Sequence, residues 1–285
     1  MSLKYYTAAL LCLFSFNALA ADEAENFIGW RANIKRIALD ISSTNVSNSK
    51  EYQDSPNTAL SADSENVYKG VLDFIMEYGQ PLYQWNNRAY MTYGKTTLKP
   101  YGKPQSSSEN SDEILFTSDY MRKMWRYWDS DVGPFGSLGY QTEFTANGDA
   151  PRNKVIRGKA GIKLFNNKYI SELYAAAVGE IDMTYNPSDQ KSAWEIGITA
   201  QYPLRDGVKF ELESYFRDYL TYSRYVGTDF KYDFNLVTRM SVKINDTFSI
   251  APFMSYRRAQ AREASAAGSN FMIGVSLAYS DIFNL

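Results

Sequence analysis

Apolar and polar residues alternate one by one along many segments of this chain, and this pattern restricts its fold more than any other feature. In residues 68–78, apolar or aromatic side chains alternate with Lys69, Asp73 and Glu77. The same alternation recurs in four later segments, 156–164, 194–202, 208–217 and 231–244. Because successive side chains of a strand point to opposite faces, the pattern predicts an all-β chain whose strands have one apolar and one polar face.

The predicted strands are long enough to cross a membrane. Their apolar faces span about 9–13 residues, whereas strands of soluble sandwiches are nearer 5 or 6. Several of these faces begin and end with an aromatic residue, as in the pairs Tyr68 and Tyr78, Trp194 and Tyr202, and Phe271 and Tyr279. Tyr and Trp favour membrane interfaces, and two aromatic girdles are typical of transmembrane barrels. Strand length and girdles therefore favour a transmembrane barrel over a soluble sandwich or barrel.

The connections between these strands alternate in length. Short turns are expected at 79–81, 166–168, 205–207 and 245–246, and long polar loops at 43–64, 96–112, 145–153, 186–191, 224–230 and 263–269. Short periplasmic turns and long outer loops characterise bacterial up-and-down barrels, which have an even number of strands. We predict twelve antiparallel strands, near 30–42, 66–78, 82–95, 113–125, 133–144, 154–165, 169–185, 192–204, 208–223, 231–244, 247–262 and 270–283. The alternation is least regular in the first and the fourth of them.

The N-terminus has the organisation of an export signal. Lys4 precedes a short apolar run, and the small residues Ala18 and Ala20 define a cleavage site, so residues 1–20 are predicted to be a signal peptide. Residues 21–29 form either a short periplasmic segment or a plug, and residues 30–285 form the barrel. The single cysteine, Cys12, lies within the predicted signal, so the exported chain has no disulfide. The mean hydropathy of −0.40 alone suggests a soluble periplasmic protein, but alternation hides the hydrophobicity of a barrel.

The last predicted strand contains a further indication of export to the outer membrane. Residues 274–279 fit the pattern Gly-x-x-apolar-x-apolar, which resembles the C-terminal signal read by the barrel-assembly machinery. Ile273 and the six residues after Tyr279 depart from that signal. We therefore expect a bacterial outer-membrane protein of a Gram-negative cell, with the assembly machinery, outer-membrane lipid and lipopolysaccharide as partners.

Composition excludes several kinds of chemistry. The 285 residues include no histidine, which excludes mechanisms that need a Ser-His or Asp-His pair. A net charge of −2 gives no basic excess for nucleic acid. Carboxylate pairs such as Glu211 and Glu213 are more simply explained by pairing with inward Lys and Arg. We expect no enzyme, no cofactor and no metal site. The carboxylates in or beside the outer loops are expected to be solvated or to contact lipopolysaccharide through bridging cations; these carboxylates are Asp63, Glu65, Asp112 and Glu113.

The polar faces of the strands are expected to line the interior. Opposite charges share these faces, as in Lys209 with Glu211 and Asp233 with Arg239. The candidate lining residues are Lys69, Asp73, Glu77, Glu143, Arg157, Lys159, Lys163, Glu172, Glu180, Glu195, Lys209, Glu211, Glu213, Arg217, Lys231, Asp233, Arg239, Lys243 and Arg257. The positive strip 157–163 and the acidic residues of the next two strands suggest a transverse field that admits small hydrophilic solutes. Twelve strands lie between a filled eight-stranded interior and a sixteen-stranded channel, so a narrow pore and a salt-bridged plug both remain open.

Several short segments carry a resemblance to a known family. They are 68–73 (Tyr-Lys-Gly-Val-Leu-Asp), 77–78, 85–87, 93–94, 116–120 (Phe-Thr-Ser-Asp-Tyr) and 140–144 (Tyr-Gln-Thr-Glu-Phe). Over residues 66–283 the chain resembles the salt-induced outer-membrane protein (YdiY-like) family and related barrels. The resemblance rests on diffuse spacing and implies an outer-membrane barrel without assigned catalytic residues.

Two functions follow as hypotheses. The first is a narrow porin or channel for small hydrophilic solutes. The second is a non-conducting structural or surface-interaction barrel that acts through its outer loops, mainly 43–64 and 96–112. These loops are rich in Ser, Asn and Asp, a composition that suits solvated loops better than a tight protein interface.

Overall fold

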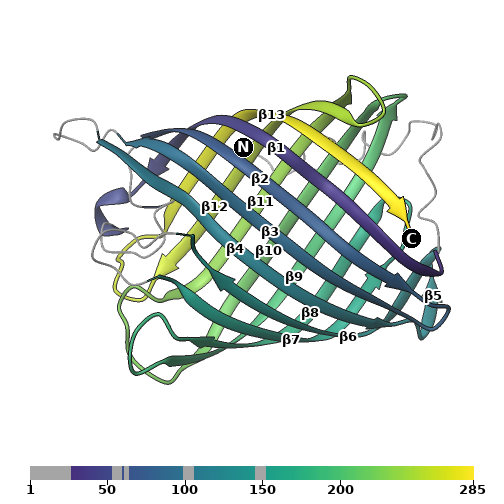
Figure 1. The fold of residues 1–285 in the computed structure, drawn as a ribbon. Helices are drawn as coiled ribbons and strands as arrows, with labels where there is room; N and C mark the ends of the chain where they lie inside the picture. Colours follow the sequence, from purple (N-terminus) through teal and green to yellow (C-terminus); the bar gives the residue numbers. More distant parts are fainter. Residues whose placement is uncertain (1–26, 53–59, 61–63, 99–105, 145–151) are drawn as a thin grey trace, which may run out of the picture.

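The strands form one closed barrel in the computed structural model, which describes residues 27–52, 60, 64–98, 106–144 and 152–285 (Figure 1). The strands are β1 (Gly29–Ser47), β2 (Ser64–Gly79), β3 (Tyr83–Leu98), β4 (Ser106–Arg122), β5 (Trp125–Tyr127), β6 (Ser130–Thr142), β7 (Lys154–Phe165), β8 (Ile170–Asp182), β9 (Asp189–Arg205), β10 (Val208–Tyr222), β11 (Phe230–Lys243), β12 (Phe248–Ala261) and β13 (Gly268–Asn284). A single 3₁₀ turn among the described residues, η2 (Ser49–Tyr52), follows β1.

Neighbouring strands pair antiparallel around the whole circumference. The order is β4-β3-β2-β1-β13-β12-β11-β10-β9-β8-β7-β6, and pairing of β4 with β6 completes the ring. The three-residue β5 pairs with β6 alone, as a hairpin at one end. The prediction of a closed antiparallel barrel of twelve strands is therefore confirmed, and β5 is an addition to it.

The alternation separates an apolar outer face from a polar inner face. In β1, Leu39 and Ile41 are 50% and 48% exposed, whereas Asp40 and Ser42, which alternate with them, are 4% and 7% exposed. Apolar side chains that are half exposed over a whole barrel surface are those that lipid would cover. The buried residues of the chain are correspondingly those that face the interior.

Aromatic residues cluster at the end where β1 begins and β13 ends. Trp30 packs on Tyr78 with ring centroids 4.8 Å apart and lies 6.2 Å from Trp85, while Tyr83 stacks on Tyr120 at 5.6 Å. The short turns between β2 and β3, β7 and β8, β9 and β10, and β11 and β12 are at this same end. We call it the periplasmic end, by the rule that relates short turns to the periplasm, and the opposite end the outer end.

Two strands are longer than the sequence predicts. β1 continues to Ser47 rather than residue 42, and β4 begins at Ser106 rather than residue 113. The polar Ser42 and Thr44 face the interior, so their polarity marks an inward face and not the start of a loop. A register shift between Ile34 and Arg36 explains the irregular alternation of β1, because a bulge moves later side chains to the opposite face.

The remaining boundaries agree with the prediction to within a few residues. β1 begins at Gly29, one residue before the predicted start of the barrel. The predicted signal peptide and most of segment 21–29 lie outside the described residues, and the signal peptide stays a prediction. Over the part of the chain that is described, no helix is long and apolar enough to cross a membrane.

Candidate functional site

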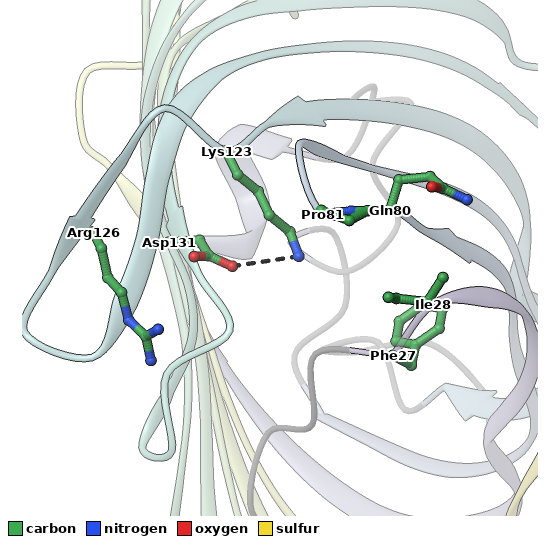
Figure 2. Close-up of a pocket in the computed structure, with 7 residues that line it drawn as sticks. All are labelled: Phe27, Ile28, Gln80, Pro81, Lys123, Arg126 and Asp131. Atoms are coloured by element: carbon green, nitrogen blue, oxygen red, sulfur yellow. Dashed lines mark ion pairs between the residues drawn. The ribbon is translucent and has the colours of Figure 1, made fainter.

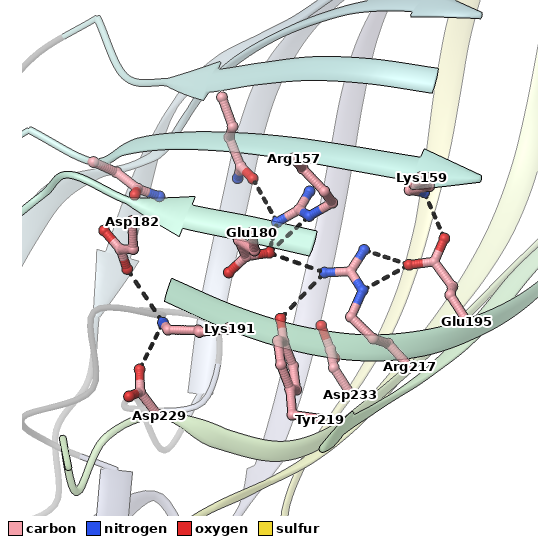
Figure 3. Close-up of polar contacts among 12 residues, drawn as sticks. Arg157, Lys159, Glu180, Asp182, Lys191, Glu195, Arg217, Tyr219, Asp229 and Asp233 are labelled. Carbon is pink, nitrogen blue, oxygen red and sulfur yellow. Dashed lines mark hydrogen bonds and ion pairs between the residues drawn. The ribbon is translucent and has the colours of Figure 1, made fainter. Parts of the chain in front are cut away.

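Glu195 is the centre of the largest ion-pair network on the inner face (Figure 3). Its carboxylate accepts a hydrogen bond from Lys159 Nζ at 2.5 Å and one from the Tyr174 hydroxyl at 2.5 Å. Arg217 Nε donates to the same carboxylate at 2.6 Å. The side chain of Glu195 is only 1% exposed, so two cations and a hydroxyl replace the water that it loses.

The network continues toward the outer end of β7 and β8. Arg157 Nε donates to Glu180 Oε2 at 2.8 Å, and Arg217 Nη1 lies 3.7 Å from the same oxygen. Arg217 Nη1 also donates to the Tyr219 hydroxyl at 3.2 Å. Four consecutive strands, β7 to β10, are thus joined by charged side chains along their inner face.

Further ion pairs join neighbouring strands elsewhere on the wall. Arg88 donates to both oxygens of Asp73 at 2.6 and 2.7 Å, and Arg257 donates to both oxygens of Asp233 at 3.0 and 2.7 Å. Arg239 shares a polar face with Asp233 but is not its partner, because the cross-strand guanidinium of Arg257 reaches both oxygens of Asp233 in a bidentate geometry.

The positive strip on β7 is paired with acidic residues that the sequence places on the next two strands. Besides Arg157 and Lys159, the third cation, Lys163, lies 3.4 Å from Glu172 on β8 and 3.6 Å from Asp119 on β4. Each cation therefore has a carboxylate beside it on the wall, and a transverse field that acts on solutes stays a prediction.

Several paired cations remain partly open to solvent although they point inward. The side chains of Arg88, Arg257 and Lys159 are 30%, 25% and 22% exposed. A packed plug would bury such side chains completely. Their exposure indicates that water-sized space remains beside these side chains.

The segment after β1 covers part of the outer end. Tyr52 of η2 is 1% exposed and Leu60 is fully buried, and both pack with Ala259 and Ala261 of the inner face of β12. The Tyr52 hydroxyl accepts a hydrogen bond from Gly268 N at 2.7 Å. Part of the predicted outer loop 43–64 therefore lies inside the mouth of the barrel.

Glu51 fixes this segment to the loop between β12 and β13. Its carboxylate accepts hydrogen bonds from the Ser265 hydroxyl and Ser265 N, both at 2.7 Å, and from Ala266 N at 3.2 Å. The hydrogen bond from the Ser265 hydroxyl, followed by those from the two backbone groups, lowers the pKa of Glu51. The carboxylate is therefore the form that these donors stabilise.

A second charged cluster lies at the outer rim of β8 to β11. Lys191 Nζ donates to Asp229 at 2.7 Å and to Asp182 at 3.3 Å. Burial, partly offset by Lys191, raises the pKa of Asp229, and neighbouring Asp189 adds to the rise. The lysine is shared among carboxylates, which suits a structural tie between outer loops.

A cavity of about 320 Å³ lies at the periplasmic rim, close to the β5 hairpin (Figure 2). Lys123 Nζ and Asp131 form an ion pair there at 3.5 Å. The remaining lining residues are Phe27, Ile28, Gln80, Pro81 and Arg126. This cavity contains none of the predicted lining residues, so the inner wall is the stronger candidate for function.

The structure places most of the predicted lining residues on the inner face. Buried or half-buried there are Lys69, Asp73, Glu77, Arg157, Lys159, Lys163, Glu172, Glu180, Glu195, Glu211, Glu213, Arg217, Asp233, Arg239 and Arg257. Lys209, Lys231 and Lys243 are exposed near strand ends, and Glu143 lies beyond β6, where it accepts a hydrogen bond from Asn153 N at 3.1 Å. That these residues line a conducting pore stays a prediction.

Sequence reasoning missed at least five charged residues of the inner wall. Arg31, Arg36 and Asp40 lie on β1, where the bulge disturbs the alternation, Arg88 lies on β3 and Asp119 lies on β4. Arg31 Nε donates to Glu77 at 2.6 Å. Asp73 and Glu77 share their strand with a single cation, Lys69, and that shortage was the available signal for Arg31 and Arg88.

Neither metal chemistry nor carboxylate catalysis finds support on the described wall. Within the described ranges, no three carboxylates converge in the arrangement of a metal site. Glu211 accepts a hydrogen bond from Ser241 at 2.8 Å and pairs with Lys209 at 2.7 Å. The candidate acid pair Glu211 and Glu213 thus contains one carboxylate that is already neutralised.

Comparison with known proteins identifies the fold. No protein-family model matches the chain, and no curated protein matches its sequence. An outer-membrane channel from Pseudomonas putida F1 superposes with a TM-score of 0.55 at 8% identity, over 93% of this chain and 100% of that one. The NanC porin gives a TM-score of 0.41 at 13% identity over 87% and 100% of the two chains. The channel DcaP of Acinetobacter baumannii gives 0.41 at 8% over 92% and 100%.

Of these three similarities, only the first has a TM-score above 0.5 and supports a conclusion about the fold. It shows that the chain has the fold of outer-membrane barrels, and the bacterial outer membrane as its location stays a prediction. The resemblance to the salt-induced, YdiY-like family stays a prediction, because no family model supports it. The chain is a twelve-stranded barrel of the outer-membrane type.

Proposed function

We propose that this chain forms a narrow water-filled channel for small hydrophilic solutes, without enzymatic activity. The observation that carries the proposal is the partial exposure of inward cations such as Arg88 and Arg257, whose charges are neutralised by Asp73 and Asp233 on the wall. Pairing along the wall leaves the axis free, whereas pairs that cross the lumen would close it. Water beside such a polar wall can carry small hydrophilic solutes.

We expect the refolded barrel to conduct ions steadily in a planar bilayer. To show that the current passes through the lumen, Ser255→Cys places a thiol on the inner face of β12, and Met254→Cys, the control, places one on the outer face. If the predicted signal peptide is removed, the chain has no other cysteine. A charged thiol reagent should reduce the current of the Ser255 variant and leave the Met254 variant unchanged. A folded barrel that carries no current contradicts the proposal.

The second candidate function is a non-conducting barrel that acts at the cell surface, through loops that contact lipopolysaccharide or another partner. It is favoured by Tyr52 and Leu60, which cover inward Ala259 and Ala261 at the outer mouth.

If this segment limits the current, Tyr52→Ala should raise the conductance by about twofold, because the ring no longer holds the segment inside the mouth. Tyr127→Ala, at an exposed aromatic of the periplasmic hairpin, is the control. A barrel that stays silent with both variants supports the second function.

A further inference from the structure

Two carboxylate oxygens at the outer rim of the barrel lack a hydrogen-bond donor. Asp189 begins β9, and Asp229 precedes β11 in the connection from β10. The Oδ2 atoms of both side chains are buried, and neither has a hydrogen-bond partner. Buried polar atoms are nearly always paired, and a buried carboxylate oxygen without a donor is costly. This pair of oxygens therefore needs a group that the neighbouring side chains do not supply.

Contacts place these two carboxylates beside each other, around a shared lysine. Lys191 Nζ lies 2.7 Å from Asp229 Oδ1 and 3.3 Å from Asp182 Oδ2 (Figure 3). Asp189 Oδ2 lies 3.9 Å from the same nitrogen, which is too far for a hydrogen bond. The side chains of Asp189 and Asp229 are within hydrogen-bonding reach of each other. A hydrogen bond joins two carboxylates only when one of them carries a proton.

The other donors near Asp229 bind backbone carbonyls. Arg224 Nη1 donates to the Pro187 carbonyl, and Arg262 Nη1 donates to the Arg224 carbonyl at 3.4 Å. The Tyr222 hydroxyl donates to the carbonyl of residue 230. The titratable groups on the elements that pack against Asp229 are Asp182 of β8, Asp189 and Lys191 of β9, Tyr222 of β10, and Arg262 and Glu263 of the β12–β13 connection, with Arg224 in its own connection. Among the described residues, none of them donates to either Oδ2 atom, so a proton taken from water completes the hydrogen bonding of the pair.

The electrostatics of Asp229 agree with this geometry. Burial raises the pKa of Asp229 and Asp189 adds to the rise, which Lys191 only partly offsets. A carboxyl group whose pKa is raised by folding destabilises the folded state while it is ionised. That penalty is present above the raised pKa and is removed as the pH falls through it, because the folded chain then binds the proton more tightly than the unfolded chain does. The contact between the two carboxylates is therefore stronger in acid than at neutral pH.

The pair joins two connections at the outer end of the barrel. Asp189 follows the β8–β9 connection, and its Oδ1 accepts hydrogen bonds from the Ser223 hydroxyl at 2.7 Å and from Arg224 N at 3.1 Å, both in the β10–β11 connection. Asp229 ends that second connection. We propose that Asp189 and Asp229 share one proton and form a clasp, which holds the two outer connections together more tightly as the external pH falls. The clasp goes beyond the channel function and does not require conduction.

The test is backbone hydrogen exchange of the refolded barrel in lipid vesicles at pH 5 and pH 7. The rates are expressed as protection factors, which removes the intrinsic pH dependence of exchange. The N–H group of Arg224 reports on the clasp, because it binds Asp189 Oδ1. We expect its protection to be about threefold higher at pH 5 than at pH 7. The N–H group of Ile170, which binds the uncharged Asn167 side chain at a periplasmic turn, should show no such difference.

Asp229→Asn separates the shared proton from other effects of acid. The amide is uncharged and can donate an N–H to Asp189 Oδ2, as the protonated carboxyl group does. Protection of the Arg224 N–H group at pH 7 should therefore reach the native value at pH 5 and lose its pH dependence. Asp189→Asn keeps an oxygen for Arg224 and removes the repulsion, so it should lose the pH dependence as well and serves if the first variant misfolds. Asp206→Asn, in an exposed periplasmic turn, is the matched control and should keep the native pH dependence.

The outcomes separate the clasp from the channel. Equal protection at the two pH values in the native barrel, or a pH dependence that persists in Asp229→Asn, overturns the clasp. Protection at pH 7 that rises with calcium chloride and falls with a chelator also overturns it, because a metal ion then takes the place of the proton. A silent barrel with the expected pH dependence rejects the channel and retains the clasp; a conducting barrel without that dependence does the reverse.

Discussion

Replacing Glu195 by leucine is expected to cost about 3–5 kcal/mol of unfolding free energy, because it leaves the buried Arg217 and the partly buried Lys159 without their carboxylate. Lys159 and Arg217 both donate to Glu195, and the side chains of Arg217 and Glu195 are 7% and 1% exposed. Lys159 keeps 22% of its side chain exposed, so most of the loss is expected to come from Arg217. Guanidinium unfolding in lipid vesicles, followed by the fluorescence of the five tryptophans, measures the loss.

Glu211→Leu on the neighbouring strand is the matched control. Its carboxylate also faces inward and pairs with a lysine, but the side chains of Glu211 and Lys209 are 28% and 45% exposed. Water screens this pair, so the same substitution should cost less than about 1 kcal/mol. Equal losses at the two positions contradict the assignment of Glu195 as the centre of a buried network.

Gly161→Ala is expected to have the second largest effect, with a loss of about 3 kcal/mol from overpacking. A Cβ atom at this position lies 2.0 Å from the carbonyl oxygen of Ala175 and 2.7 Å from the Cα of Ala176. Both are backbone atoms of the adjacent strand, so the clash is relieved only by moving β7 away from β8. The unfolding midpoint of the variant should fall without a change in the slope of the transition.

Gly158→Ala, three residues earlier on the same strand, separates steric clash from a general effect of alanine. A Cβ atom at Gly158 meets nothing within 4 Å. Alanine restricts the unfolded chain more than glycine does, so this variant should gain up to about 1 kcal/mol. A loss at Gly158 comparable to that at Gly161 shows that the close approach of β7 and β8 is not the cause.

The fold could be predicted because a transmembrane barrel repeats one rule in every strand. In pairs such as Leu39 and Asp40, or Lys69 and Gly70, successive residues point alternately outward and inward. The number and the direction of the strands follow from this alternation. The rule does not distinguish a polar residue that faces the lumen from one that begins a loop. Thr44 was therefore assigned to a loop, although it lies on the inner face of β1.

The candidate site could be predicted only as a set of residues, not as a set of contacts. The alternation placed Asp233 and Glu195 on the inner face, but it carries no information on which cation of another strand lies opposite. That depends on the stagger between strands, which pairs Asn235 with Arg257 and brings Arg257 to Asp233. The inward position of Arg36 depends further on the bulge in β1, which has no simple sequence signature.

Closure of the ring joins the first strand of the chain to the last. β1 pairs with β13 from Arg31 opposite Asn284 to Ser47 opposite Ser269. Until β13 is in place, β1 and β12 each present a row of unpaired N–H and C=O groups, which hydrocarbon cannot satisfy. A barrel without β13 would leave both of these edges open to hydrocarbon. We therefore expect the pairing of β1 with β13 to be the step that makes the barrel stable in a membrane.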